Sequence, residues 1–471
     1  MKNLRMKMLC LLSVLAASTA LVGCSRNQAS EVEPKHPTTT TAWATPQSRP
    51  IPVSVRNTDT APRVLGQRKF PYPYDAMLAL SSDADSETLR KFNLVHEFIN
   101  TTAMTPVGRG LGLDFADSFF MYNGNNQSGY VDIHGLPMSR ELSYFKGVSN
   151  VPYAASVINH YIQVGWIDTM HTYGDFSEVN SSKTLFRRTL AVQAIQALKQ
   201  NGDEIEVWTD HGNQSNVDNF GRYGASAFDS YQQGANPWSP YYHTDVTLPY
   251  GIRFVWADGS SDAFGMNSVI YPLRLPDGRR VWGFNRYTNY AYNNKGGPLW
   301  DWTVWSLDKQ LTPQNLHTLE EKHQYSVVAQ HLDGATTPFP LPKEAVNALR
   351  LLANEYHQGR ILVARTSRLL NYNVAQQYVR YSVTYRDGKA YIDITAIADP
   401  VFGRHVPTLD EIRGLTFYTT NPARTVLELA GRPILDKLVQ HNASDGRAPS
   451  IGIAWFPEDT TNYVMTEPGV S

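Results

Sequence analysis

Strand-like and helix-like segments alternate along the middle of the chain, and few folds accommodate that order. Residues 75–80 form a short apolar run typical of a buried strand, and residues 87–100 follow with apolar side chains at helical spacing, which Ser86 is suited to cap. Strands that alternate with helices favour a parallel sheet or barrel. Further helices are predicted at 154–164, 182–199, 316–322 and 343–357, and further strands at 204–212, 325–332 and 361–364.

The pattern changes beyond about residue 376. Residues 379–396 alternate polar and apolar side chains around Asp387-Gly388, a pair typical of a tight hairpin. Short strand-like stretches separated by turns follow at 415–420, 425–431 and 451–456. We therefore expect residues 376–471 to form a small C-terminal β-sandwich appended to an α/β body.

The amino terminus has the order of an export signal. Three positive side chains precede an apolar stretch that ends in Leu-Val-Gly-Cys, which resembles the bacterial lipobox. This ending predicts removal of the signal peptide, residues 1–23, and lipid attachment to Cys24. Since Ser25 follows, we expect an outer-membrane lipoprotein of the bacterial cell envelope. Residues 24–66 are rich in Thr, Pro and Ser, which predicts a tether between the lipid and the folded part.

Charge and composition narrow the class of protein. The 42 Lys and Arg residues balance 43 Asp and Glu residues, so the chain lacks the basic footprint of a nucleic-acid binder. Apolar residues make up 42% of the sequence, which is enough for a sizeable core. Once the signal is removed, Cys24 is the remaining cysteine, which excludes an internal disulfide. No other apolar run is long enough to cross a bilayer.

Acids and histidines follow the ends of several predicted strands. Asp83 and Asp85 end the first one, and residues two apart in an extended segment point to the same side, so their charges need a cation or a shared proton. In an α/β barrel the carboxyl ends of the strands meet at one face, so we expect such side chains to converge. Mixed carboxylates and imidazoles suit a divalent metal ion. The other candidates are His171 with Asp175, Asp210 with His211, and His331.

The segments SSDAD, MHTYGDF, WTDHG, VVAQHL and ILVARTSRLL, in this order, resemble the polysaccharide deacetylase family, carbohydrate esterase family 4. The resemblance covers about residues 70–373. It implies a distorted (β/α) barrel, placed at residues 67–375, and one divalent metal ion. The residues that it assigns are Asp83 as general base, Asp85 and His171 as metal ligands, and His331 as general acid.

One position departs from the family pattern. The family has a second histidine four residues after the first, but Asp175 stands there in this chain. A site of Asp85, His171 and Asp175 would be more anionic, which shifts the preference toward Mn, Mg or Ca. Alternatively, His211 takes the missing place and Asp175 orients a histidine. Zn, Mn, Co and Ni are the candidates for the ion, and a chain that had lost its metal would be inactive.

Aromatic and amide-rich stretches are predicted to contact sugar. Aromatic faces pack against the C–H faces of sugar rings, and such side chains are frequent at 236–245, 285–294 and 298–305. At least half of these aromatics are instead expected in the core. The additional candidates for substrate contact are Asp210, Tyr242, His243 and Asp245.

The expected function is an envelope-anchored, metal-dependent deacetylase of N-acetylated polysaccharide, in which metal-activated water attacks the acetamide carbonyl. A glycoside hydrolase that uses Asp83 and Asp210 as its acid pair is an alternative, because glycosidases also need two carboxylates. A third interpretation is a catalytically inactive lipoprotein that binds glycan through a vestigial site.

Overall fold

The computed structural model describes residues 61–466, with gaps at residues 129–139, 177–182, 212–214, 222–231, 258–259, 262, 293–297, 301 and 334–338. The predicted signal peptide, Cys24 and the predicted tether up to residue 60 lie outside the described residues. The chain from Thr60 onward forms one compact unit. Within its described part, every helix is too short or too polar to span a bilayer.

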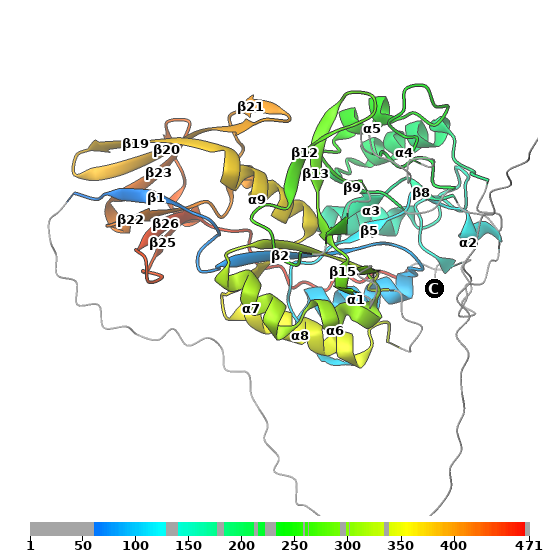
Figure 1. Cartoon of the computed structure of the whole chain (residues 1–471), viewed down its shortest axis with the longest axis horizontal. Helices are drawn as coiled ribbons and strands as arrows, with labels where there is room; N and C mark the ends of the chain where they lie inside the picture. The colour runs from blue at the N-terminus through cyan, green and yellow to red at the C-terminus, as the bar shows by residue number, and fades with distance from the viewer. Residues whose placement is uncertain are drawn as a thin grey trace, which may run out of the picture. The chain divides into compact units, whose positions relative to one another are not determined.

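A large, mainly parallel β-sheet forms the centre of an α/β fold (Figure 1). The order is β11-β14-β17-β2-β5-β7-β9-β10-β13-β12, with β18 also paired to β2, and β12 is antiparallel to β13. The α/β class predicted from the alternation of segments is thus confirmed. The strands are β2 (Ala76–Ser82), β5 (Asp117–Phe119), β7 (Ile167–His171), β9 (Val207–Thr209), β10 (Phe254–Trp256), β11 (Ser260–Ser261), β12 (Ile270–Arg274), β13 (Arg280–Phe284), β14 (Arg286–Tyr287), β17 (Tyr325–Gln330) and β18 (Ile361–Val363).

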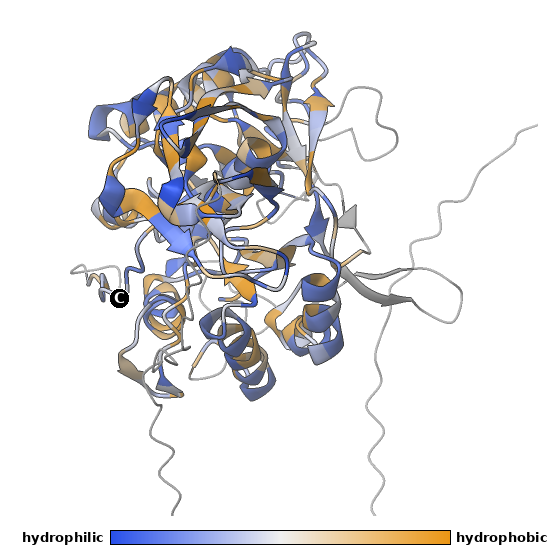
Figure 2. Ribbon diagram, turned by 90° about the vertical axis from the view of Figure 1, so that its left-hand side faces the viewer, coloured by the Kyte–Doolittle hydropathy of each residue, from blue (hydrophilic) through white to orange (hydrophobic). Residues whose placement is uncertain are grey.

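Helices cover this sheet. In Figure 1, α1, α6, α7 and α8 lie below β2, while α3, α4 and α5 lie above it. Figure 2 shows helix ribbons that carry both hydrophilic and hydrophobic stretches, as expected when one face packs on a core and the other meets water. All seven residues of β2 are buried in consequence. The helices are α1 (Leu89–Asn100), α3 (Ala155–Val164), α4 (Arg188–Asn201), α5 (Thr244–Tyr250), α6 (Leu307–Gln310), α7 (Pro313–Glu321), α8 (Lys343–His357) and α9 (Thr366–Tyr378).

Two helices begin later than predicted. α1 begins at Leu89 because Thr88, rather than Ser86, is the cap: its hydroxyl accepts the N–H of Lys91. Ser86 has a φ of 62°, which is outside the helical region. α4 begins at Arg188, and the residue before it is extended, with a φ of −143°.

The two ends of the large sheet come from neighbouring residues. β13 pairs with β10 near one end of the order, and β14 pairs with β17 near the other. Asn285 alone separates these two strands along the chain. A single stretch of chain therefore contributes to both ends of the sheet.

Two smaller sheets are built from the strands after α9 together with β1, in the orders β1-β22-β26-β25 and β19-β20-β23-β24, with β21 paired to β20. The predicted hairpin at Asp387-Gly388 is confirmed, since these residues join β19 to β20. The rings of Tyr381 and Phe417, one from each sheet, lie 4.8 Å apart. The strands are β1 (Val64–Arg68), β19 (Val379–Arg386), β20 (Lys389–Asp399), β21 (Gly403–His405), β22 (Thr416–Thr419), β23 (Thr425–Leu429), β24 (Arg432–Pro433), β25 (Val439–Asn442) and β26 (Ser450–Ile453).

The first strand of the described chain pairs with the C-terminal sheets, and its last residues contact the α/β body. β1 begins at Val64, inside the range predicted as a tether, and pairs with β22 of the C-terminal region. The N–H of Met465 donates to the hydroxyl of Tyr161 in α3 at 2.8 Å, and its carbonyl accepts from Asn93 in α1 at 2.8 Å. The last described residues therefore lie on the α/β body, although they fall in the range expected for the sandwich.

Candidate metal centre

Side chains from four strand ends meet around the carboxylate of Asp85. Nε2 of His211 lies 2.8 Å from Oδ1 of Asp85. At the other oxygen, Oδ2, Nε2 of His171 lies at 3.1 Å and Nε2 of His331 at 3.2 Å. The structure thus brings these four predicted residues together, at the carboxyl-terminal ends of β2, β7, β9 and β17.

The chain around His171 holds its ring in one orientation. The ring is buried and stacks on Phe120, with centroids 5.3 Å apart. Nδ1 lies 2.9 Å from the hydroxyl of Thr209, which leaves Nε2 directed at Asp85. The next residue, Thr172, has a φ of 51°, a strained conformation for a β-branched residue. Backbone strain of this kind is common at functional sites.

A polar network fixes His211. Oδ1 of Asn216 accepts the N–H of Phe176 at 2.8 Å, so its NH₂ group faces Nδ1 of His211 at 2.7 Å. In the neutral ring Nδ1 accepts from Asn216, so the ring proton lies on Nε2, where Asp85 accepts it. Asn219 holds the backbone of His211 through both its N–H, at 2.9 Å, and its carbonyl, at 2.7 Å.

Asp85 and its histidines shift one another's pKa. Burial alone would raise the pKa of Asp85, but His211 and hydrogen bonds from the other two rings hold it well below its ordinary value. Burial alone would lower the pKa of His211, but Asp85 raises it to about 10. The pKa of His331 is raised by Asp85 in the same way, against the effect of burial. The charge of the Asp85 carboxylate thus favours protons on His211 and His331, and a cation could take the place of those protons.

The second acid, Asp83, forms a buried ion pair with Arg286. Both oxygens are engaged, at 3.0 Å from Nη1 and 2.7 Å from Nη2. Burial would raise the pKa of Asp83, yet the charges of Arg286 and then of His171 lower it. The guanidinium also lies over the ring of Trp256, 4.4 Å from the centroid. Asp83 is therefore ionised and fixed, and its Oδ1 lies 3.9 Å from Nδ1 of His171.

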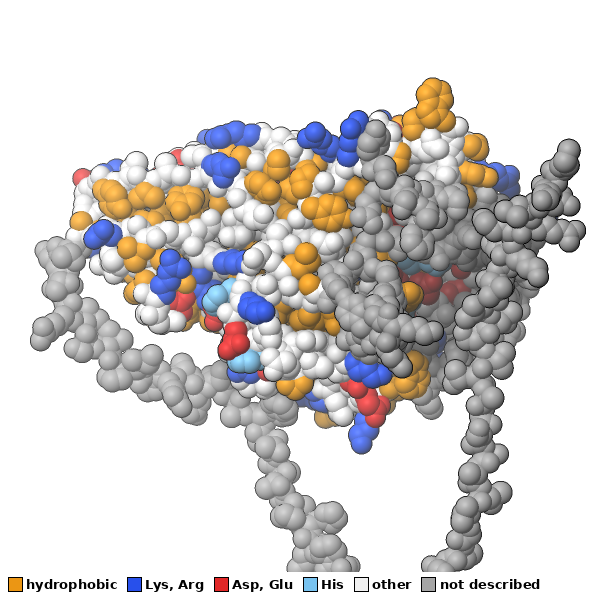
Figure 3. Space-filling model, in the orientation of Figure 1, with side chains coloured by type: hydrophobic (Ala, Val, Ile, Leu, Met, Phe, Trp, Pro, Cys, Tyr) orange, Lys and Arg blue, Asp and Glu red, His pale blue; other side chains and the backbone are white. Residues whose placement is uncertain are grey.

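Three predicted ligands form a compact donor group. Asp85, His171 and His211 each offer one ligand atom, and these atoms lie within 4.8 Å of one another. Asp175 is not part of this group, and its Oδ2 accepts from Nδ2 of Asn125 at 2.7 Å. Within the described residues, the geometry therefore favours His211 over Asp175 as the third ligand. On the face drawn in Figure 3, acidic and histidine side chains meet in a hollow at the right-hand side.

Asp210 lies in the core rather than at the site. It is 1% exposed and accepts the indole N–H of Trp208 and the backbone N–H of Phe220, each at 3.0 Å. Its other oxygen accepts from Gln232 at 3.2 Å. These bonds give it a structural role, which weighs against the alternative that pairs it with Asp83 to cleave a glycosidic bond.

The other predicted substrate contacts lie along α5 and just before it. His243 is fully buried and is bonded to Thr247 at 2.8 Å, which leaves its ring no surface for a sugar. Asp245 forms a two-bond ion pair with Arg188, at 2.6 and 2.7 Å. The same guanidinium binds the carbonyl of Tyr242. The structure therefore does not bring these three residues to Asp85.

Three residues of the site were not predicted from the sequence: Arg286, Thr209 and Asn216. Arg286 stands in an aromatic stretch, residues 285–294, that was interpreted only as a sugar contact. The feature that could have revealed it is an arginine inside a strand-like segment. If such a segment is buried, the charge of the arginine needs an acidic partner. Thr209, the last residue of β9, and Asn216, in the loop after it, carry no comparable signal, because uncharged polar residues are common in such positions.

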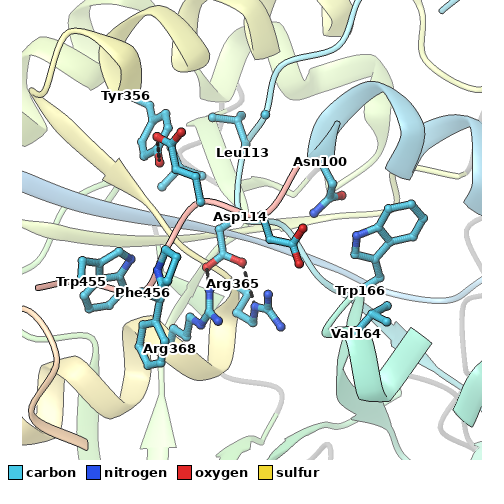
Figure 4. Close-up of a pocket in the computed structure, with 15 residues that line it drawn as sticks. Asn100, Leu113, Asp114, Val164, Trp166, Tyr356, Arg365, Arg368, Trp455 and Phe456 are labelled. Carbon is cyan, nitrogen blue, oxygen red and sulfur yellow. Dashed lines mark hydrogen bonds and ion pairs between the residues drawn. The ribbon is translucent and has the colours of Figure 1, made fainter. Parts of the chain in front are cut away.

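A second polar region lies at the amino-terminal ends of β5 and β7. Asp114 accepts from Nε of Arg365 and Nη1 of Arg368, each at 2.8 Å, as Figure 4 shows. The hollow beside them measures about 30 Å³, room for a water or two rather than a sugar. This carboxylate is satisfied by guanidinium groups that stay charged, so it is a structural ion pair.

The site combines one carboxylate with three imidazoles at the ends of parallel strands. Such a set of donors suits a divalent ion. When the sequence is compared with known proteins, no protein-family model matches it and no curated protein matches it.

Proposed function

We propose that this chain is a metal-dependent deacetylase that removes acetyl groups from N-acetylated polysaccharide. The observation that carries the proposal is the junction of Asp85 with three imidazoles, beside a second acid, Asp83. In one place these residues offer a donor set for an ion, a proton acceptor and a proton donor. Metal-assisted hydrolysis of an amide requires these three groups.

The residues present fit a divalent ion. Asp85, His171 and His211 would hold it, and it would replace the proton through which His211 bonds to Asp85. One carboxylate with two imidazoles suits Zn, Mn, Co or Ni better than Ca or Mg. Once bound, such an ion supplies Lewis acidity, which polarises an acyl oxygen and acidifies water.

Asp83 is the proton acceptor in this proposal. Its ion pair with Arg286 keeps it ionised and in one position, so it is ready to take a proton from the attacking water. The same ion pair lowers its pKa and makes it a weak base. A base this weak would need a more acidic water, which a bound ion would supply.

His331 is the proton donor for the leaving nitrogen. Asp85 raises its pKa, which favours the protonated ring that a proton donor needs. Nδ1 lies 3.3 Å from the carbonyl of Trp302, which orients the ring, and the side chain is 17% exposed. When the C–N bond of the acetamide breaks, the amine needs a proton, and His331 is placed to give it.

An exposed indole beside His331, that of Trp302, supports a sugar substrate. Trp302 and Trp305 are 39% and 54% exposed, and the ring of Trp302 lies 6.4 Å from that of His331. Sugar rings stack on exposed aromatic faces, and the ring of Trp302 lies next to the proposed proton donor. These two residues are the proposed platform for the polysaccharide.

The proposal includes a closed architecture. We propose that the large sheet closes into a distorted (β/α) barrel, because Asn285 joins the strands at its two ends. The two C-terminal sheets, which contact through Tyr381 and Phe417, are proposed to form a β-sandwich. In this arrangement the strand ends around Asp85 line one mouth of the barrel, where active sites of such folds lie.

The proposed location is the bacterial cell envelope. The order of charged, apolar and small residues before Cys24 supports lipid attachment there, and so an outer-membrane lipoprotein. The polar stretch that follows would let the enzyme reach polysaccharide outside the lipid layer.

Acetate release tests the function. Full-length protein is incubated with oligomers of N-acetylglucosamine, and acetate and new amines are measured. We expect equal amounts of both, loss of activity with a chelator, and recovery with Zn, Mn, Co or Ni. Asp83→Asn should be inactive, whereas Asp203→Asn, a buried acid in the loop after α4, should be active.

Two results would count against the function. Binding of the oligomers without acetate release would instead support the inactive glycan-binding protein. New reducing ends without acetate would support the glycoside hydrolase.

A further inference from the structure

Three further acidic side chains lie buried at these strand ends. Glu87 follows β2, Asp117 begins β5 and Asp333 follows β17, and they are 2%, 1% and 1% exposed. Asp117 begins β5 but still lies beside the carboxyl-terminal end of β2, because it pairs with Ser82, the last residue of β2. The proposed deacetylase chemistry uses none of the three acids.

The three carboxylates converge, and one oxygen of each lacks a hydrogen-bond partner. One oxygen from each side chain lies within 4.8 Å of the others. In the described part of the structure, Oε1 of Glu87, Oδ2 of Asp117 and Oδ1 of Asp333 accept no hydrogen bond. A buried carboxylate oxygen without a donor is costly, so three such oxygens together point to a ligand that these residues do not themselves supply.

The charges around this group do not balance. The ammonium group of Lys91 attracts Asp333, but Lys91 also donates to the carbonyl of Ser86 at 2.9 Å. Glu141, a fourth buried acid, repels Glu87. At least two carboxylates are therefore left without a matching positive charge among the described residues. Shared protons or a bound cation are the two ways to remove this repulsion.

We propose that Glu87, Asp117 and Asp333 hold a hard divalent cation, Ca²⁺ in the first place, in a site separate from the Asp85 centre. Every donor is a carboxylate, and oxygen ligands select Ca²⁺ or Mg²⁺, whereas imidazole ligands select transition metals. The three carboxylates offer one ligand oxygen each, while Oδ1 of Asp117 already accepts the N–H of Ser118, and water would complete the shell that Ca²⁺ takes. The ion would tie together the ends of β2, β5 and β17.

Calcium content after refolding tests this site. Full-length protein is unfolded with a chelator, refolded with or without Ca²⁺, dialysed and analysed for elements. Because the acids are buried, the ion is expected to enter during folding. We expect about one Ca²⁺ per chain and a Tm about 3 °C higher in the calcium-refolded protein.

Variants separate the two sites. Asp333→Asn, and as a second variant Asp117→Asn, should bind Ca²⁺ at least about tenfold more weakly and keep the transition metal. His211→Ala should lose the transition metal and keep Ca²⁺. The control is Asp203→Asn, in which an acid that is 3% exposed is changed outside both clusters, and it should keep both ions.

Several results would overturn the proposal. Wild-type protein that refolds fully and binds no Ca²⁺ or Mg²⁺ is one, and Asp333→Asn protein that binds Ca²⁺ as tightly as wild type is another. If the acids share protons instead, Tm is independent of Ca²⁺ and rises in Asp333→Asn. Since deacetylase activity is not measured, failure of this site and failure of the proposed function are distinguishable.

Discussion

Two carboxylates of this protein, Asp114 and Asp85, are bound by different types of basic side chain. Asp114, at the amino-terminal end of β5, is held by two guanidinium groups. Asp85, after the carboxyl-terminal end of β2, is held by three imidazoles at similar distances. A guanidinium stays charged at any working pH, but an imidazole can release its proton and bind a metal instead. The first pair is therefore permanent, while the second can exchange protons for an ion.

The largest expected effect is a loss of activity when an acid beside Asp85, but not Asp114, is changed. Asp83→Asn should lower kcat for acetate release roughly 1,000-fold, because the attacking water loses its proton acceptor. KM and the bound transition metal should change little, since Asp83 is not in the donor group. Asp114→Asn is the matched control, as it also leaves arginine unpaired but far from the chemistry, and it should retain kcat within about twofold. Equal loss of activity in both variants would contradict this assignment.

A second effect separates the regions by stability. Asp114→Asn should lower the free energy of unfolding by about 3 kcal/mol, because Arg365 and Arg368 lose their shared partner. Urea unfolding measures this loss, and elemental analysis should show an unchanged transition metal. A stable Asp114→Asn protein would mean that solvent already screens this ion pair.

A third experiment asks whether His211 is a ligand. Asn216 donates to Nδ1, which places the ring proton on Nε2, where the ion would bind. In Asn216→Asp, the new carboxylate should hold the ring proton on Nδ1 and leave Nε2 free to bind the ion. The affinity for the transition metal, measured in competition with a chelator, should then rise about tenfold. Asn219→Asp adds the same charge beside the backbone of His211 and should have a smaller effect. Weaker binding in Asn216→Asp would argue that His211 only bonds to Asp85.

The smallest effect concerns a histidine without a charged partner. Burial lowers the pKa of His96 to about 3, so the folded protein excludes a proton that the unfolded chain accepts below about pH 6.5. Its contribution to stability is therefore full above pH 6.5 and is lost as the pH falls toward 3. Between pH 7.5 and 5.5, wild type should lose about 1 kcal/mol more than His96→Phe. Urea unfolding of both proteins at the two pH values checks this, and equal losses would show that His96 is protonated when folded.

Much of the site was predictable because strand ends are visible in the sequence. Apolar runs that stop at Asp83, His171 and His331 show where strands end, and parallel strands end on the same side. That reasoning requires no side-chain geometry. It therefore placed Asp85 and its three histidines in one site before their distances were known.

Other features depend on burial and register, which the sequence does not display. Asp117 belongs with Glu87 only because β5 is offset against β2. His243 and Asp210 have the composition of site residues, but their packing takes them into the core. The choice between Asp175 and His211 likewise depends on loop conformation, since both follow a strand end.

Elemental analysis of the purified full-length chain, beside His171→Ala, tests the central claim most directly. We predict about one transition-metal ion per chain in the wild type and a loss of that ion in His171→Ala, with folding retained. A wild-type protein that carries no such ion after loading and dialysis, or a variant that keeps it, would contradict a metal centre built on Asp85, His171 and His211.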